Sequence, residues 1–188
     1  MSIEARVALR LTLLGLVTVV VQLAAVSQAP IFGVRADLAP LVVMSVGLLA
    51  GSIPGAGMGF AVGLLVDMAL VQKLGVSSLL FIAIGYGAGR LRELRDPAHA
   101  LVPVAAGAFA TVVATVGFSI AQYLLGVDSP LSWILARDIV LTILINTILA
   151  LPVYNLVRRV LLPLLPDDPR RRRRRAYTTG GLSPISRG

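Results

Sequence analysis

The sequence has 188 residues, of which 57% are hydrophobic and 14% are charged, and its mean hydropathy is +0.89. This composition excludes an ordinary soluble domain, because the apolar residues come in runs of the roughly 17–25 residues that cross about 30 Å of hydrocarbon. A membrane barrel is excluded as well, since its strands would alternate apolar and polar residues. The net charge of +8 does not indicate nucleic-acid binding, because most arginines lie between or beyond the apolar runs, where they act as topology signals.

The apolar runs predict an all-α integral membrane bundle of six transmembrane helices. The second helix is short, so we expect it to be tilted or shielded by its neighbours, with Asp37 as its N-cap. A tight turn is predicted at 51–55 and a charged internal loop at 90–97. The expected helices cover about 7–26, 38–49, 56–71, 76–89, 98–125 and 132–157.

Charge divides the chain and predicts its orientation. Residues 1–158 form the six-helix domain, and residues 159–188 form a basic cytoplasmic tail that we expect to be disordered. Six helices put both termini on one side, which carries seven basic residues when the chain is counted up to Arg159, against three on the other side. The positive-inside rule therefore places both termini in the cytoplasm. The seven are Arg6, Arg10, Arg90, Arg92, Arg95, Arg158 and Arg159; the three are Arg35, Lys73 and Arg137.

Residues 55–92 form the most distinctive stretch, in which two apolar runs are joined by a polar break at 72–75. Glycines recur at four-residue spacing in both runs, which lets helix backbones approach closely in a membrane. Such a row drifts about 40° per step on a helix, so we expect mainly packing within the chain, with docking of another membrane protein as the alternative. The candidate packing or partner-contacting residues are Gly55, Gly59, Gly63, Asp67, Gly75, Gly85, Tyr86 and Gly89. A similar small-residue row in the fifth helix is Gly107, Thr111, Thr115 and Ser119.

Asp67 is the only acidic residue well inside an apolar run, so its charge should face protein, water or a partner. A structural reading pairs it with Arg137, with Lys73 or with polar groups at a helix end. A functional reading makes it a proton site, a cation site or a ligand contact. We favour the structural or assembly role, with an ion pair between Asp67 and Arg137, because one carboxylate does not make a proton relay.

The sequence shows no catalytic constellation. Its single histidine, His99, is expected to be interfacial, cysteine is absent, and no serine has an evident activating partner. No residues have metal-ligand spacing, and the glycines at 55–59 lack the Gly-Lys-Ser/Thr ending of a phosphate loop. We therefore expect no catalytic residue, no metal, no cofactor and no enzyme activity.

An unbroken arginine run lies in the tail. Its expected roles are binding to anionic lipid or simple retention on the cytoplasmic side. RNA binding is disfavoured because no aromatic residues are interleaved with the arginines. The run consists of Arg170, Arg171, Arg172, Arg173, Arg174 and Arg175.

The central hairpin carries a recognisable pattern, supported by Asp37-Leu38 before the second helix. The pattern residues are Gly59-Phe60, Gly63-Leu64-Leu65 and Asp67, then Leu74-Gly75, Leu79, Gly85-Tyr86 and Gly89. This pattern resembles the family of the bacterial rod-shape-determining protein MreD. Size and predicted helices agree with that family over about 7–158, whereas the tail is not part of the pattern.

The resemblance implies a non-enzymatic component of the bacterial cell-elongation machinery in the inner membrane. Its implied partners are an MreC-like single-span protein and the complex of a SEDS glycosyltransferase with a penicillin-binding transpeptidase. The resemblance also implies a fold similar to the substrate-binding component of energy-coupling-factor transporters, which leaves small-molecule (vitamin-type) binding as the alternative function. The outer-half polar set is thin for such a binder, and this favours the scaffold. That set is Asp67, Gln122, Trp133, Arg137 and Asp138.

Overall fold

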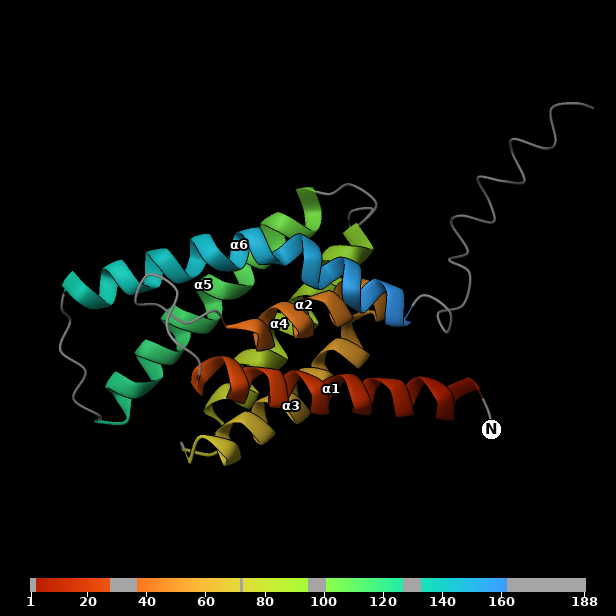
Figure 1. The fold of residues 1–188 in the computed structure, drawn as a ribbon, viewed down its shortest axis with the longest axis horizontal. Coiled ribbons are helices and arrows are strands. Elements are labelled where there is room, and N and C mark those ends of the chain that lie inside the picture. Colours follow the sequence, from red (N-terminus) through yellow and green to blue (C-terminus); the bar gives the residue numbers. More distant parts are fainter. Residues whose placement is uncertain (1–2, 28–36, 72, 95–100, 127–132, 162–188) are drawn as a thin grey trace, which may run out of the picture.

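Six α-helices and no strand make up the described part of the computed structural model, which confirms the all-α prediction (Figure 1). The structure describes residues 3–27, 37–71, 73–94, 101–126 and 133–161. The helices are α1 (Ile3–Ser27), α2 (Leu38–Ala50), α3 (Ser52–Ala69), α4 (Val76–Leu94), α5 (Leu101–Leu124) and α6 (Trp133–Leu161). The tail from 162 onward, with the arginine run, lies outside the described residues, as does His99.

Helix α2 is the centre of the bundle. It has 13 residues, so it is about 20 Å long at ~1.5 Å per residue, shorter than the ~30 Å hydrocarbon core. It contacts each of the five other helices, and all its residues from Ala39 to Leu49 are buried. A helix that is apolar on every side must be covered by other helices or by lipid, and here neighbouring helices cover it. The expectation that this helix is shielded is therefore confirmed.

The lengths of the other helices fit a membrane protein. Four described helices (α1, α3, α5 and α6) are long and apolar enough to cross a bilayer. Helix α4 has 19 residues, but its last turns carry Arg90, Arg92 and Glu93. That all six helices cross the membrane remains a prediction.

Four predicted helix boundaries were wrong by four or five residues. Helix α1 begins at Ile3 instead of 7, and α6 ends at Leu161 instead of 157. The other two lie at the expected turn and at the expected charged loop. The expected turn at 51–55 is limited to Gly51, whose φ of 106° suits glycine, and α3 already begins at Ser52. Pro54 does not prevent this, because proline is tolerated in the first turn of a helix. Helix α4 continues to Leu94 through much of the expected charged loop, where Arg90 and Glu93 form an i,i+3 ion pair of 2.9 Å on its surface.

Hydrogen bonds mark the two ends of the bundle. At one end the Arg10 guanidinium donates to the Val160 carbonyl (3.0 Å), so the start of α1 lies beside the end of α6, as Figure 1 also shows. At the other end the Lys73 ammonium donates to the Leu125 carbonyl (2.8 Å), which ties the α3–α4 connection to the end of α5. The first and last described helices therefore begin and end on the same side.

Small residues bring α5 close to α6. A Cβ added to Gly107 would overlap the Ala150 side chain on α6. The Thr111, Thr115 and Ser119 hydroxyls each donate to the carbonyl four residues earlier, so these polar groups are satisfied inside an apolar helix. The predicted row in the fifth helix thus packs at one end and satisfies its own hydroxyls along the rest.

Candidate functional site

The glycine rows form the contact between α3 and α4, which is the most extensive helix pair in the bundle. A Cβ added to Gly59 or Gly63 would overlap the backbone of Phe81 or Ser78 on α4. On α4 the same holds for Gly85 against Gly55 and for Gly89 against Ser52. Here backbone packs on backbone, as expected where van der Waals contact drives association in lipid.

Helix α2 joins this contact through its own glycine. A Cβ at Gly47 would overlap the Gly85 carbonyl, and Gly55 packs against both. Gly47, Gly55 and Gly85 thus bring three helices together at one point. The sequence pattern had indicated a two-helix hairpin, and the contribution of α2 appears only in the tertiary structure.

Asp67 joins the two helices of the hairpin at the other end of the glycine row. Its side chain is fully buried, and its Oδ2 accepts hydrogen bonds from the backbone N–H groups of Gly75 (2.7 Å) and Ser77 (3.3 Å). These groups open α4, where a carboxylate is favoured by unpaired N–H groups and the helix dipole. Asp67 Oδ1 is also buried and has no hydrogen-bond partner among the described residues.

The structure therefore pairs Asp67 with polar groups at a helix end, one of the partners considered from the sequence. The expected ion pair with Arg137 is not formed between these two described residues, and Arg137 is exposed on α6. Lys73 is likewise engaged elsewhere, with the Leu125 carbonyl. The N–H groups that bind Asp67 belong to residues eight and ten positions further along the chain. They lie close to it because the α3–α4 connection turns tightly through Gly75, at a φ of 97°.

Tyr86 differs from the closely packed glycines and from Asp67, because its side chain faces outward, as do those of the pattern residues Phe60 and Leu79. Its side chain is exposed, and the Arg90 guanidinium lies over its ring at 5.5 Å from the centroid. This geometry is a cation–π contact on the surface of α4. Tyr86 can therefore contact a partner or lipid, whereas its neighbour Gly85 is buried against Gly55 inside the bundle.

A second polar cluster lies at the start of α2, and the sequence did not predict it. Asn146 of α6 accepts from the Asp37 N–H (3.3 Å) through Oδ1 and donates to the Asp37 carbonyl (2.8 Å) through Nδ2. The same Nδ2 donates to the Thr111 hydroxyl (3.2 Å). Gln22 of α1 accepts from the Leu38 N–H (2.9 Å). Asp37 does occupy the N-cap position of α2, but side chains from two other helices hold the backbone there.

The signal for this cluster was present in the sequence. Gln22 is the one amide of α1 and Asn146 lies in an apolar stretch near the middle of α6, and both are buried. In a membrane such side chains normally face protein and form hydrogen bonds there. The sequence could not show that both reach the same helix start. The outer-half polar residues behave differently: Gln122 and Asp138 are half-buried on separate helices, and the Trp133 side chain is outside the described part.

Neither polar cluster has the composition of a catalytic or metal centre. Within the described residues, no three His, Cys, Asp or Glu side chains form a group that could hold a metal ion. The polar atoms of both clusters bind helix starts instead. Chemically, the arrangement can fix helix positions, because most of its hydrogen bonds join side chains to backbone groups.

Comparison with known proteins bears on the same region. The sequence model of the family described as rod shape-determining protein MreD matches residues 4–160. This chain belongs to the MreD family. The match covers all six described helices almost completely and ends where α6 ends, before the arginine run. No curated protein and no solved structure gives a significant match. MreD membership implies a role in rod-shape determination by a structural membrane protein.

Proposed function

We propose that this protein is a non-enzymatic component of the cell-elongation machinery in the bacterial cytoplasmic membrane, with both termini in the cytoplasm. The observation that carries the proposal is the match to the MreD family over the whole helical region. The charges support the orientation: the end of the bundle with the start of α1 carries Arg10, Arg90 and Arg159, whereas the opposite end carries Lys73 and Arg137.

The proposed partners are an MreC-like single-span protein and, through it, the SEDS glycosyltransferase and penicillin-binding transpeptidase. Internal packing buries the glycine rows, so a partner would contact outward faces of the bundle. On the hairpin these faces carry the exposed side chains of Phe60, Met68, Leu79 and Tyr86. A partner helix would bind them by close apolar packing, since lipid gives no hydrophobic drive.

The test is depletion combined with affinity purification from native membranes. We expect loss of elongated cell shape on depletion, and co-purification of a single-span membrane protein with wall-synthesis enzymes. A vitamin-type binder would instead retain a small ligand through purification and associate with ATPase subunits. Mass spectrometry that finds a stoichiometric vitamin-like ligand and no wall-synthesis partner would contradict the proposal.

For the tail we propose binding to anionic lipid through Arg170–Arg175. Each basic residue near an anionic surface contributes about 1 kcal/mol, and salt screens the attraction. Binding to vesicles that contain phosphatidylglycerol should fall when 170–188 is deleted, and the loss should shrink as salt rises. A loss that is independent of salt would contradict this assignment.

A further inference from the structure

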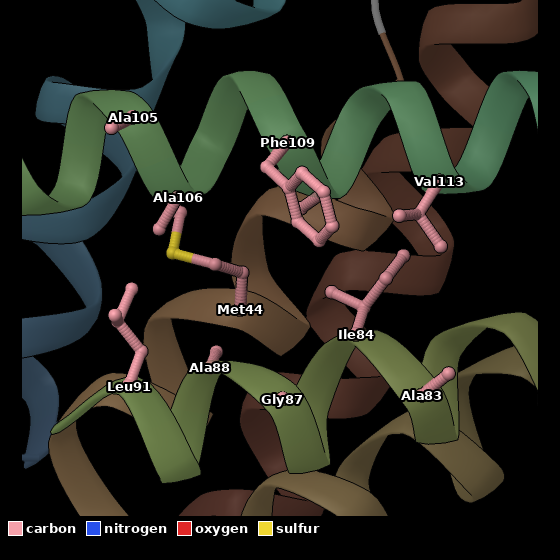
Figure 2. A pocket seen from close by; sticks show the side chains of 11 residues that line it. Met44, Ala83, Ile84, Gly87, Ala88, Leu91, Ala105, Ala106, Phe109 and Val113 are labelled. Atoms are coloured by element: carbon pink, nitrogen blue, oxygen red, sulfur yellow. The ribbon is translucent and has the colours of Figure 1, made fainter. Parts of the chain in front are cut away.

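An apolar groove lies between α4 and α5 on the outside of the bundle. Its volume is about 450 Å³ and its floor reaches the fully buried Met44 of the central helix α2. Figure 2 shows Leu91 and Ala105 near one end and Ala83 and Val113 near the other. Every residue that lines it is apolar, so only a hydrocarbon group would be bound without leaving polar groups unpaired.

The groove is open on its outer side and closed below. Ala83, Gly87 and Ala105 are exposed along the rim, and Phe109 is 70% exposed. A Cβ added to Gly87 would meet nothing within 4 Å. This glycine, unlike Gly85 and Gly89 on the same helix, is therefore not needed for packing inside the chain.

The length of the groove matches one leaflet of a bilayer. From Ala83 to Leu91 the α4 backbone rises about 12 Å at ~1.5 Å per residue, less than half of the ~30 Å hydrocarbon core. Beyond Ala83 the two helices close, because Leu80 fills the space beside Gly117. The groove thus runs from the middle of the bundle to the end where α1 begins and α6 ends.

This shape fits an acyl chain better than a protein helix. An α-helix with its side chains is about 10–12 Å wide, and α4 and α5 are themselves in contact, so a third helix could not reach down to Met44. A membrane-spanning partner helix would also need a groove that extends across the full thickness of the bilayer, whereas this one extends across only one leaflet. An unbranched hydrocarbon chain is narrow and flexible enough to follow the floor.

The open end of the groove is basic. Arg90 lies three residues beyond Gly87 and is therefore its neighbour on the surface of α4. Its guanidinium is exposed and binds Glu93 at 2.9 Å, and with five N–H donors it has capacity for a phosphate as well. Arg92 is on the same turn. The charge at this end complements an anionic headgroup.

We propose that the α4–α5 groove binds one acyl chain of an anionic phospholipid from the leaflet on the side of the termini, with its phosphate at Arg90. The inference does not depend on the proposed function, since it needs only a bundle that lies in a bilayer. The site is distinct from the arginine run, which lies outside the described residues.

The proposal can be tested by fluorescence quenching in vesicles. The chain has one tryptophan, so Trp133→Phe gives a dark background in which Phe109→Trp reports on the groove. Ile120→Trp, exposed on the same helix but outside the groove, is the matched control. The full chain is reconstituted in phosphatidylcholine with brominated acyl chains on either phosphatidylglycerol or phosphatidylcholine.

We expect brominated phosphatidylglycerol to quench the groove probe with about fivefold higher apparent affinity, the preference given by one arginine near the surface. The control probe should show no preference. Gly87→Leu or Ala83→Leu, which fill the groove, should abolish the preference, whereas Gly57→Leu should not, because Gly57 also faces open space but on α3. Arg90→Gln should lower the preference, and Glu93→Gln, which removes a competing acceptor, should raise it.

Equal quenching of the groove probe by both lipids would overturn the proposal, and so would a preference that survives both filling variants. A second experiment uses a photo-crosslinking residue at Ala105 in native membranes. Capture of phospholipid supports the proposal. Capture of a protein at that position would show that the groove is a protein interface and would also overturn it.

Discussion

Asp67 and Asn146 are both buried polar residues, but they bind the starts of different helices and differ in how far along the sequence their partners lie. Asp67 binds backbone N–H groups eight and ten residues further along the chain, whereas Asn146 binds backbone 109 residues away. Both place acceptor oxygens at a helix start, where the first N–H groups have no partner in their own helix. Lipid offers no water to replace such partners, so each residue protects backbone that would otherwise be unpaired.

Replacing Asp67 tests whether the start of α4 depends on it. Asp67→Ala leaves two N–H groups of Gly75 and Ser77 without their acceptor, and we expect a loss of about 1–3 kcal/mol in unfolding free energy. Asp67→Asn keeps one oxygen and should retain part of the stability. The measurement is thermal unfolding of the purified chain in detergent. Arg137→Gln should be silent; an effect as large as that of Asp67→Ala would restore the ion-pair hypothesis.

The Asn146 cluster predicts an order of effects. Asn146→Leu removes three hydrogen bonds and should cost about 2 kcal/mol, given that a polar contact between membrane helices is worth about 0.6–1.7 kcal/mol. Gln22→Leu removes one bond and should cost less. Asn155 on the same helix is exposed, so Asn155→Leu serves as control. Equal stability of the Asn146 and Asn155 variants in detergent unfolding would show that the cluster does not hold α2.

At the scale of elements, the α3–α4 hairpin and the central α2 form one packed unit. The three helices meet backbone to backbone at Gly47, Gly55 and Gly85. None of the three helices can move aside without breaking other backbone contacts, so a methyl group added at any of these glycines has no space. The glycines of α3 are therefore not equivalent: Gly59 and Gly63 face α4, whereas Gly57 faces outward.

Alanine substitutions on α3 separate these two classes. Gly63→Ala should disrupt the bundle, because its Cβ would overlap the Ser78 backbone. Gly57→Ala should be tolerated and gain up to about 1 kcal/mol from helix propensity. The fraction of chain that elutes as a folded monodisperse species after detergent extraction measures both. Similar yields for the two variants would contradict the packing described for the hairpin.

At the scale of the whole molecule, the two ends of the bundle differ in charge and in what joins them. On the basic side of the bundle, Arg10 joins α1 to the last turn of α6. On the opposite side, Lys73 joins the α3–α4 connection to the residue that follows α5. The basic end of the bundle contains the open end of the proposed lipid groove, the start of α1, the end of α6 and the start of the tail. An anionic inner leaflet would attract this end and fix the depth of the bundle.

Site-directed labelling tests the orientation. The chain has no cysteine, so single cysteines can be introduced at Ser129 and Ser186 without removing others. A membrane-impermeant maleimide should label Ser129→Cys in intact cells and Ser186→Cys only after permeabilisation. Labelling of Ser186→Cys from outside would reverse the assignment.

The sequence by itself determined the helical class, the order of the helices and the hairpin formed by the third and fourth helices. These follow from local features: apolar runs must form helices in lipid to satisfy their backbone, and glycines at four-residue spacing mark a close contact. The same features predicted family membership. Helix ends were less well predicted at Ser52 and Leu94, because proline in a first turn and charges in a last turn look like loop in a sequence.

Only the tertiary structure decided which groups meet. It assigned Asp67 to the start of α4 instead of to Arg137, and it brought Gln22 and Asn146 to the start of α2. It also left Gly87 facing an apolar groove while Gly85, two residues earlier, is buried. The physical reason is that residue spacing fixes which face of a helix a side chain occupies, whereas the neighbour on that face depends on how all six helices pack around α2.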